Sequence, residues 1–565
     1  MWNIQKFVSL LFFGLLVETA MSETVQTSPD IEAADMLLWG GTIHTGENDR
    51  TPAEAIGVRS GVIVFVGSRV EAQHYLGQKT KVVSLGGSTL FPGFVDAHSH
   101  LSGIGLREMT LNLEGLTSLK ALQKSLQSWT NQHPTEEIIL GRGWIETHWP
   151  ENRFPTRWDI DKIVGDKPVL LTRADGHALV ANSAALIAAG ISASTPVPFG
   201  GDILKDNHGE PTGMLIDAAM SLVRGLVPAV TADTVAAQLI KGGEVYASYG
   251  WTGTHNMSVP WAIIPTMEQL SDSGALKIKV YNSINASDAE RIFETGVRHS
   301  KNNRITTRAI KMYIDGALGS RGAALLEPYS DAKTSGLLLM KANDTLPVLR
   351  KALKKGIQIN THAIGDRGNR LVLDWYEKTF AETPSAERKV ADPRWRIEHA
   401  QIINPSDIER FKKLDVIASM QPSHAIGDLH FAPDRLNDKR LHGAYAWKTL
   451  IESGVTVAGG SDAPVERGDP RIEFYAAVAR ADMNGFQGPN WHPEEAISRQ
   501  DALKMFTLWP AIASFQETDL GSIKVGKRAD FTIFAKDLMT IPAAEILTTD
   551  VVMTIVDGEI AFEKP

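Results

Sequence analysis

The feature that most constrains the fold is a series of short apolar segments that alternate with amphipathic stretches along the middle of the chain. Apolar runs of strand length separated by segments of helical spacing are typical of β–α units. The eight runs begin near residues 94, 252, 277, 309, 356, 396, 416 and 455, and from the second run on they recur every 20 to 50 residues. Eight parallel strands joined by crossover helices can close into a (β/α)8 barrel. The sequence therefore predicts an α/β fold with such a TIM barrel over residues 92–509.

The two ends of the chain have a different texture, because both are rich in short β-type runs. Residues 34–91 contain several such runs, and residues 510–565 contain three more, the last two joined at an Asp557-Gly558 turn. Since these ends bracket the α/β middle, we expect them to form one small β-sandwich domain jointly.

A long gap of about 150 residues separates the first two barrel strands. We expect residues 102–248 to form an inserted segment folded over the barrel mouth. The insertion carries predicted elements of its own: a helix at residues 118–129, strands at 138–141 and 168–172, and a hairpin around 207–209.

The composition excludes some partners. The 565 residues are 43% hydrophobic and 22% charged, an ordinary balance for a globular protein. The formal charge of -9 comes without a basic block, which argues against nucleic acid and against an anionic membrane surface as a partner. Because the chain has no cysteine, no disulfide holds the fold, and a metal must be bound by His, Asp, Glu or a modified Lys. The oligomeric state stays open, a homodimer included.

The first 22 residues have the pattern of a secretory signal peptide. Lys6 precedes an apolar stretch over residues 7–17, and the small residues Ala20 and Ser22 follow. This order of a positive, an apolar and a small-residue region predicts cleavage after Ser22 and a periplasmic or secreted enzyme. The alternative is a disordered or membrane-tethered N-terminus.

Several of the expected strands end in a side chain that can bind a metal. The first strand leads into His98 and His100, which are two residues apart and can therefore point to one metal. The fifth and sixth strands end at His362 and His399, and the eighth ends at Asp462 in a Gly-rich turn. Each residue alone has a structural explanation as a core or capping residue. Because the C-terminal ends of barrel strands converge, their joint occurrence predicts a metal site.

Further candidates surround this set. Lys311 lies inside the apolar fourth strand, where an unpaired ammonium is costly to bury. It is either paired with a carboxylate or carboxylated to a carbamate that bridges two metals. The candidates for substrate binding are His177 in the insertion, Asp315 and Arg321 after the fourth strand, and His424 after the seventh. A purely structural role remains an alternative for each of these four.

Five ordered motifs resemble the amidohydrolase superfamily, and within it the amidohydrolase-3 or YtcJ-like group, which includes N-substituted formamide deformylase. The motifs are Pro-Gly-Phe-Val-Asp-Ala-His-Ser-His at 92–100, Lys-Met-Tyr-Ile-Asp-Gly at 311–316, Thr-His-Ala-Ile-Gly-Asp at 361–366, Arg-Ile-Glu-His-Ala-Gln at 396–401 and Gly-Ser-Asp-Ala-Pro-Val at 460–465. The resemblance covers essentially the whole mature chain.

The resemblance implies a (β/α)8 barrel with a divalent metal centre, usually zinc and here two ions. The ligands implied are His98, His100 and Asp462 for the more buried metal, His362 and His399 for the second, and a carboxylated Lys311 between them. Related enzymes that work with one metal and no carbamate leave the bridging role of Lys311 open.

The chemistry expected of this site is hydrolysis. A bound metal lowers the pKa of water, the resulting hydroxide attacks a carbonyl or amidine carbon, and Asp462 moves the proton to the leaving nitrogen. The leading interpretation is an amidohydrolase that cleaves a non-peptide C–N bond of a small molecule, in an amide, an N-formyl group or a cyclic amide. A deaminase or an esterase on the same site is the alternative. A non-catalytic binding or regulatory protein is disfavoured because all six ligand positions are intact.

Overall fold

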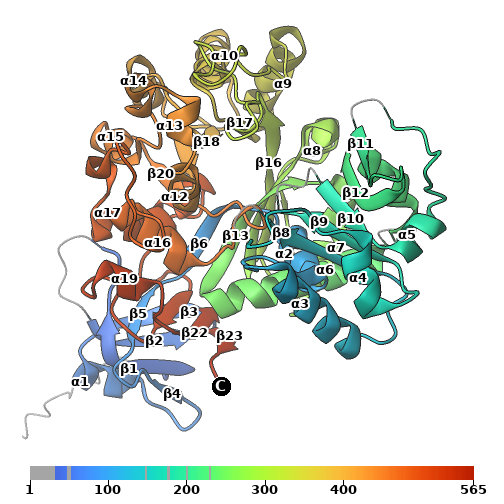
Figure 1. Ribbon diagram of the computed structural model, residues 1–565. Helices are drawn as coiled ribbons and strands as arrows, with labels where there is room; N and C mark the ends of the chain where they lie inside the picture. The colour runs from blue at the N-terminus through green and yellow to red at the C-terminus, as the bar shows by residue number, and fades with distance from the viewer. Residues whose placement is uncertain (1–31, 48–52, 147–148, 175–177, 199–200, 228–230) are drawn as a thin grey trace, which may run out of the picture.

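The computed structural model describes residues 32–47, 53–146, 149–174, 178–198, 201–227 and 231–565 (Figure 1). The signal peptide predicted at residues 1–22 lies outside these ranges, as does His177. Within the described ranges, no helix has both the length and the apolar character needed to cross a membrane.

Eight parallel strands form the barrel, and each begins within a few residues of its predicted start. In order around the barrel they are β6 (Phe94–Ser99), β13 (Trp251–Val259), β14 (Lys279–Asn285), β16 (Ile305–Tyr313), β17 (Gln358–Ala363), β18 (Arg396–His399), β19 (Ile417–Met420) and β20 (Val457–Gly459). Each neighbouring pair from β6 to β20 is parallel. The predicted fold class is therefore confirmed.

Backbone contacts between β6 and the segment after β20 bring the first and last strands together. The Asp462 N–H donates to the His98 carbonyl oxygen at 2.7 Å, and the His100 N–H donates to that of Ala463 at 2.8 Å. Glycine permits this approach, because a Cβ on Gly460 would lie 2.5 Å from the His98 nitrogen. The closure therefore places Asp462 beside both histidines of the first strand.

The helix-to-strand connections follow the usual end signals of helices. Helix α9 (Ala342–Lys355) ends at Gly356, which has a φ of 69° in the left-handed region that glycine adopts without strain. Strand β17 then runs as a buried segment from Gln358 to Thr361 and reaches His362. The connection thus sets where the fifth barrel strand delivers its histidine.

Strands from both ends of the chain share one eight-stranded sheet. Its strands are β1 (Met36–Ile43), β2 (Ala53–Arg59), β3 (Val62–Gly67), β4 (Lys81–Ser84), β5 (Thr89–Pro92), β21 (Phe531–Phe534), β22 (Val551–Val556) and β23 (Glu559–Glu563). The antiparallel pair of β5 and β21 joins the two ends. Strand β1 pairs with β4 along its first half and with β5 along its second half, so it belongs to both parts of the sheet.

The insertion between the first two barrel strands has a sheet of its own, with the order β11-β12-β10-β9-β8-β7. These strands are β7 (Leu111–Asn112), β8 (Ile139–Trp144), β9 (Val169–Arg173), β10 (Ala178–Ala181), β11 (Gly201–Lys205) and β12 (Pro211–Asp217). The predicted helix is found as α3 (Leu119–Gln132), and the predicted hairpin is the antiparallel pair of β11 and β12. Apolar clusters line both faces of this sheet. Figure 1 shows the insertion in teal beside the barrel strands, and its position over the barrel mouth stays a prediction.

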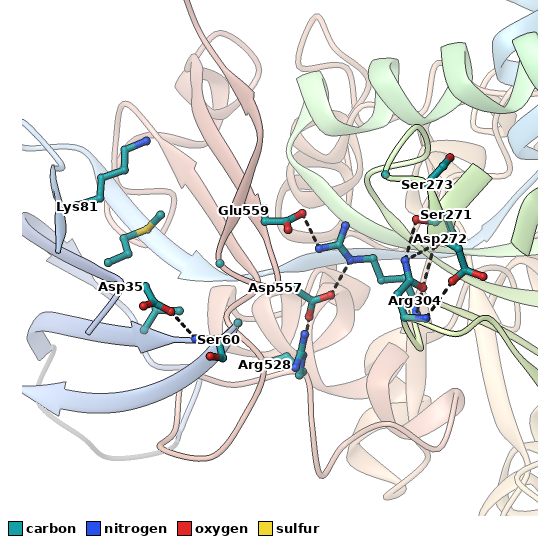
Figure 2. Close-up of a pocket in the computed structure, with 16 residues that line it drawn as sticks. Asp35, Ser60, Lys81, Ser271, Asp272, Ser273, Arg304, Arg528, Asp557 and Glu559 are labelled. Carbon is teal, nitrogen blue, oxygen red and sulfur yellow. Dashed lines mark hydrogen bonds and ion pairs between the residues drawn. The ribbon is translucent and has the colours of Figure 1, made fainter. Parts of the chain in front are cut away.

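The terminal sheet meets the barrel at the end where the barrel strands begin. A cavity of about 650 Å³ lies there between Asp35, Ser60 and Lys81 on one side and Ser271 and Arg304 on the other (Figure 2). Asp557 accepts hydrogen bonds from the side chains of Arg304 and Arg528 in its wall. Because active sites of such barrels form at the opposite end of the strands, we interpret this cavity as part of the domain junction.

Candidate metal centre

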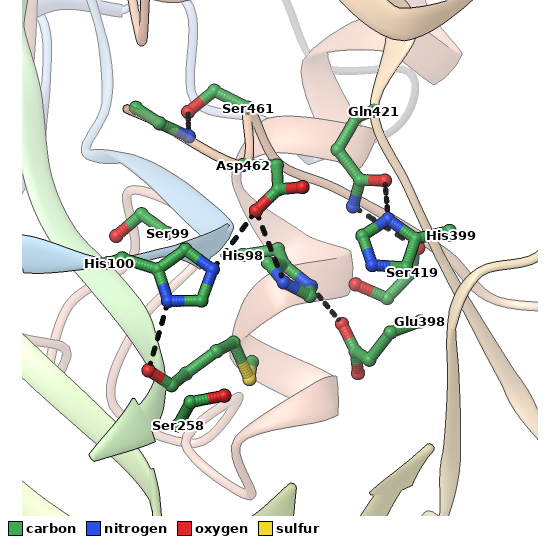
Figure 3. A network of polar contacts seen from close by, with 12 residues as sticks. His98, Ser99, His100, Ser258, Glu398, His399, Ser419, Gln421, Ser461 and Asp462 are labelled. Carbon is green, nitrogen blue, oxygen red and sulfur yellow. Dashed lines mark hydrogen bonds and ion pairs between the residues drawn. The ribbon is translucent and has the colours of Figure 1, made fainter. Parts of the chain in front are cut away.

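The C-terminal ends of β6, β18 and β20 bring three imidazoles and a carboxylate together (Figure 3). Oδ1 of Asp462 lies 3.1 Å from Nε2 of His100 and 3.5 Å from Nε2 of His98. The ligand atoms of these three residues all lie within 4.8 Å of one another. The ring of His399 lies 4.7 Å from that of His98, measured between centroids. The predicted first metal site thus has its ligand atoms facing one point.

Buried atoms without partners support a metal at this point. Within the described residues, Nε2 of His98 has no hydrogen-bond partner although it is fully buried. Buried polar atoms are nearly always partnered, and an imidazole nitrogen that faces a carboxylate and another imidazole suits a divalent cation. The residues present therefore fit a metal.

The histidines are held in the neutral form that binds metals. Burial, with a further contribution from Lys311, lowers the pKa of His98 to about 4. The same two causes lower the pKa of His362 to about 3. Burial also lowers the pKa of His399 well below its ordinary value. Each imidazole therefore keeps a free lone pair at neutral pH.

Asp462 is ionised at neutral pH despite its burial. Burial by itself would raise the pKa of this carboxyl, but His98, His100 and His399 hold it well below its usual range. The carboxylate can therefore serve as a metal ligand and accept a proton.

The orientation of His98 is fixed from behind by a buried ion pair. Nδ1 of His98 lies 2.5 Å from Oε2 of Glu398. Glu398 is itself ion-paired with Arg396, whose Nε lies 2.7 Å from Oε1. Burial would raise the pKa of Glu398, but Arg396 and His98 lower it to about 2. A charged carboxylate on Nδ1 leaves Nε2 as the atom that faces the centre.

His100 and His399 are oriented by neutral acceptors. Nδ1 of His100 donates to the Met257 carbonyl oxygen at 3.2 Å, and Nδ1 of His399 donates to Oε1 of Gln421 at 2.8 Å. Both contacts leave Nε2 as the ring nitrogen that can bind a metal, and in His100 this atom already faces Asp462.

His424 also lies near Asp462, but its hydrogen bonding differs from that of His98, His100 and His399. It lies on α12 (Pro422–Asp428), and its Nε2 is 3.7 Å from Oδ2 of Asp462. Together with His399 and Asp462 it forms a second group of possible ligands within 4.8 Å. Because the side-chain amide of Gln401 donates to Nδ1 of His424 at 3.0 Å, Nε2 carries the proton and acts as a donor. This tautomer suits the substrate-binding role predicted for His424 better than metal binding.

Lys311 and His362 lie close to the centre, but neither belongs to the groups of converging ligand atoms found in the described chain. The His362 ring lies 4.5 Å from that of His399, but its Nε2 faces Asp315 at 3.5 Å. Lys311 is 2% exposed, and its Nζ lies 4.1 Å from the ring of Tyr313. No hydrogen bond or ion pair of this ammonium occurs within the described part of the chain. The second metal site of the resemblance therefore remains a prediction.

The other predicted substrate residues have structural contacts. Asp315 is buried, and it accepts hydrogen bonds from three backbone amides in the loops after β16 and β17. Burial raises its pKa to about 7. Arg321 is paired with Asp331 through Nε and a terminal nitrogen. His177 lies outside the described residues.

Two residues of the centre have backbone angles that few side chains adopt. The φ angles of His399 and Asp462 are 72° and 59°, which lie in the left-handed region. Such conformations cost free energy in residues other than glycine and concentrate at functional sites. They occur here where two barrel strands end and their side chains turn to the centre.

The sequence interpretation missed Glu398 and Arg396. A signal was present, because a buried strand with two charged residues two positions apart must face a polar partner inside the barrel. The partner, His98, is 300 residues away in the chain, and nothing local identifies it.

Comparisons with known proteins confirm the resemblance read from the motifs. The model of the Amidohydrolase family matches residues 81–562. YtcJ of Bacillus subtilis (strain 168) is 34% identical over 540 residues, which cover 93% of this chain and 99% of the relative. N-substituted formamide deformylase of Arthrobacter pascens is 27% identical over 551 residues, which cover 94% and 98%. The crystal structure of an uncharacterized metal-dependent hydrolase from Pyrococcus horikoshii OT3 has a TM-score of 0.74 at 26% identity, over 90% of this chain and 99% of that one.

Proposed function

This chain belongs to the amidohydrolase family, and on that premise we propose that its metal centre hydrolyses a non-peptide C–N bond in a small molecule. The observation that carries the proposal is the convergence of His98 Nε2 and His100 Nε2 on one carboxylate oxygen of Asp462. A carboxylate beside two neutral imidazoles can bind a metal and can also exchange a proton with water.

The reaction proposed is the addition of water to an amide. The water oxygen forms a bond to the carbonyl carbon, the C–N bond breaks, and the products are a carboxylic acid and an amine. When bound, a divalent metal supplies a nucleophile at neutral pH by lowering the pKa of water. Asp462 accepts the proton of the attacking water and returns it to the leaving nitrogen. His424, with its Nε2–H directed into the site, is placed to donate to the substrate.

We propose zinc as the metal, because imidazole and carboxylate ligands suit it. We further propose two ions bridged by a carboxylated Lys311. The support is the buried side chain of Lys311, which contacts the Tyr313 ring but makes no hydrogen bond or ion pair within the described residues. Carboxylation would replace this costly buried cation with an anion between two cations.

We also propose that the mature enzyme is exported. The support is the sequence pattern of residues 1–22, together with a chain that has no cysteine to oxidise.

Metal content and turnover together test the proposal. The mature protein is purified with bicarbonate and without chelators, its zinc is measured by elemental analysis, and N-acyl and N-formyl amines are screened with matched esters. About two zinc ions per chain with amide cleavage support the full proposal, and about one supports amide hydrolysis without the carbamate bridge. A metal-loaded enzyme that cleaves only the esters overturns the C–N assignment, and a chain that binds no metal overturns metal-dependent hydrolysis.

A further inference from the structure

A cavity of about 340 Å³ lies between α12 and α16 (Pro470–Ala479), next to the metal centre. We name it the acidic pocket. Its lining residues are Ser423, Ile426, Gly427, His430, Glu466, Arg467, Gly468, Ile472, Glu473, Asp482, Met483 and Asn484.

One residue joins the acidic pocket to the metal centre. Oε1 of Glu466 lies 4.0 Å from Nε2 of His424, and the same nitrogen lies 3.7 Å from Oδ2 of Asp462. Ser423, which also lines the pocket, directly precedes His424 on α12. Glu466 therefore links the pocket wall to His424, which in turn lies beside Asp462.

The pocket holds three carboxyl groups and has no buried lysine or arginine among its lining residues. The carboxyl groups belong to Glu466, Glu473 and Asp482, whereas the one arginine, Arg467, is exposed. Within the described ranges, none of the three carboxyl groups is ion-paired with a lysine or an arginine. Glu466 lies beside His424, whereas Asp482 lies beside His430 and accepts hydrogen bonds from the backbone N–H groups of Asn484 and Phe486.

Glu473 is the most buried of the three acidic residues. Its side chain is buried, at 1% exposure, and it accepts a hydrogen bond from the Ser423 backbone N–H at 3.0 Å. Arg107 contacts the backbone of this segment, but its guanidinium is engaged by the Glu108 carboxylate and by the Glu466 and Arg467 carbonyl oxygens. Burial raises the pKa of Glu466 to about 8 and that of Glu473 well above its ordinary value, so both are largely protonated at neutral pH without a bound cation. A cation bound beside them would favour their ionised form.

Apolar side chains also line the pocket. Ile426, Ile472 and Met483 form its walls, and Phe486 stacks on His430 beside it with 5.5 Å between ring centroids. Acidic groups inside an apolar wall complement an aliphatic arm that ends in a positive charge. A neutral hydrocarbon would gain nothing from the carboxyl group of Glu466, and a free metal ion would gain nothing from the apolar walls.

We propose that the acidic pocket binds a protonated amine or guanidinium carried on an aliphatic arm of the substrate. The preferred substrates are then N-acyl derivatives of diamines or of basic amino acids rather than neutral amides. This inference rests on the proposed amide hydrolysis, to which it adds the substrate class.

The test compares a cationic amide with its neutral isostere. The zinc-loaded enzyme is given N-acetyl-1,5-diaminopentane and N-acetylhexylamine, in which a methyl group replaces the ammonium. We expect kcat/KM to favour the cationic amide by about tenfold or more, since a charge-assisted hydrogen bond has that magnitude. The variant Glu466→Gln should lose about tenfold of this preference, mostly through KM for the cationic amide, whereas Glu452→Gln on an exposed helix end should keep it.

Calorimetry with 1,5-diaminopentane separates this inference from the proposed reaction. If the neutral and the cationic amide are cleaved equally well, the cation site is overturned and amide hydrolysis stands. The same holds if the preference for the cationic amide survives in Glu466→Gln. If neither amide is cleaved, that result counts against amide hydrolysis. The cation site is then supported if the wild-type enzyme binds the diamine and Glu466→Gln does not. Absence of diamine binding to the holoenzyme overturns the inference.

Discussion

Nδ1 of His98 lies 2.5 Å from Oε2 of Glu398, and this contact ties the deepest imidazole of the centre to a buried ion pair. Arg396 holds the same carboxylate, with a terminal nitrogen 2.9 Å from Oε2. Since Arg396 and Glu398 both belong to β18, the sixth barrel strand orients a ligand that the first strand supplies. The position of His98 Nε2 therefore depends on a pairing across the barrel.

Replacement of Glu398 by glutamine should weaken metal binding without removing a ligand. The amide keeps the shape of the side chain but loses the charge that holds His98 Nδ1–H, and such partners typically contribute about 10–100-fold in metal affinity. The measurement is zinc affinity by competition with a chelator. The exposed Glu387→Gln is the matched control. Wild-type affinity in Glu398→Gln would show that the contact does not orient His98 for metal binding.

Asp462→Asn should abolish turnover while the chain stays folded. The substitution removes the proton acceptor, and general-base catalysis typically accounts for about 10²–10⁴-fold in rate. His98→Ala should be inactive too, through loss of the metal. Steady-state kinetics and circular dichroism measure activity and fold in the same preparations. A rate near the wild-type value in either variant would exclude this centre as the active site.

The barrel and its ligands could be predicted because their signals are local. The strand starts are marked by apolar and β-branched residues, and His98, His100, His362, His399 and Asp462 lie at or just after strand ends, so topology alone brings them to one end. Local patterns also gave the elements of the insertion.

Pairings between distant strands could not be predicted in this way. Glu398 contacts a residue 300 positions away, and Glu466 lies 4.0 Å from His424, 42 positions before it in the chain. The tautomer of His424 depends on Gln401, which lies in the loop after β18. These relationships arise from packing, which hydrophobic periodicity does not encode.

Lys311→Ala tests the bridging role proposed for this residue. If Lys311 is carboxylated, the variant should contain about one zinc ion in place of about two, and added short carboxylic acids should partly restore activity. The measurement is elemental analysis with and without acetate. Lys354→Ala, at the exposed end of α9, is the control. Unchanged metal content in Lys311→Ala would contradict the bridge.

Asp557 lies where the terminal sheet meets the barrel, and three cations contact it. Lys279 Nζ donates to it at 2.7 Å, Arg304 Nε at 2.8 Å and Arg528 Nε at 2.6 Å. Burial would raise the pKa of Asp557, but Lys279, Arg528 and Arg304 hold it well below its ordinary value. Lys279 also contacts Asp530, but the pKa of Asp530 is raised because the effect of its burial outweighs that of Lys279. We therefore expect the ionised carboxylate of Asp557, and not that of Asp530, to make the stability of this junction depend on pH.

Asp557→Asn should destabilise the protein at neutral pH and much less in acid. A carboxyl with a depressed pKa stabilises the fold above its unfolded pKa of about 3.9, and this contribution is lost as pH falls through the folded pKa. Removing one partner of a buried ion pair typically costs about 3–5 kcal/mol. The difference in free energy of unfolding between wild type and variant, from urea titrations, should therefore be largest near neutral pH and shrink steadily below about pH 4. Asp550→Asn, which removes an exposed pair with Lys564, should change stability little at any pH. A difference for Asp557→Asn that stays constant down to strongly acidic pH would mean that its charge contributes nothing to the junction.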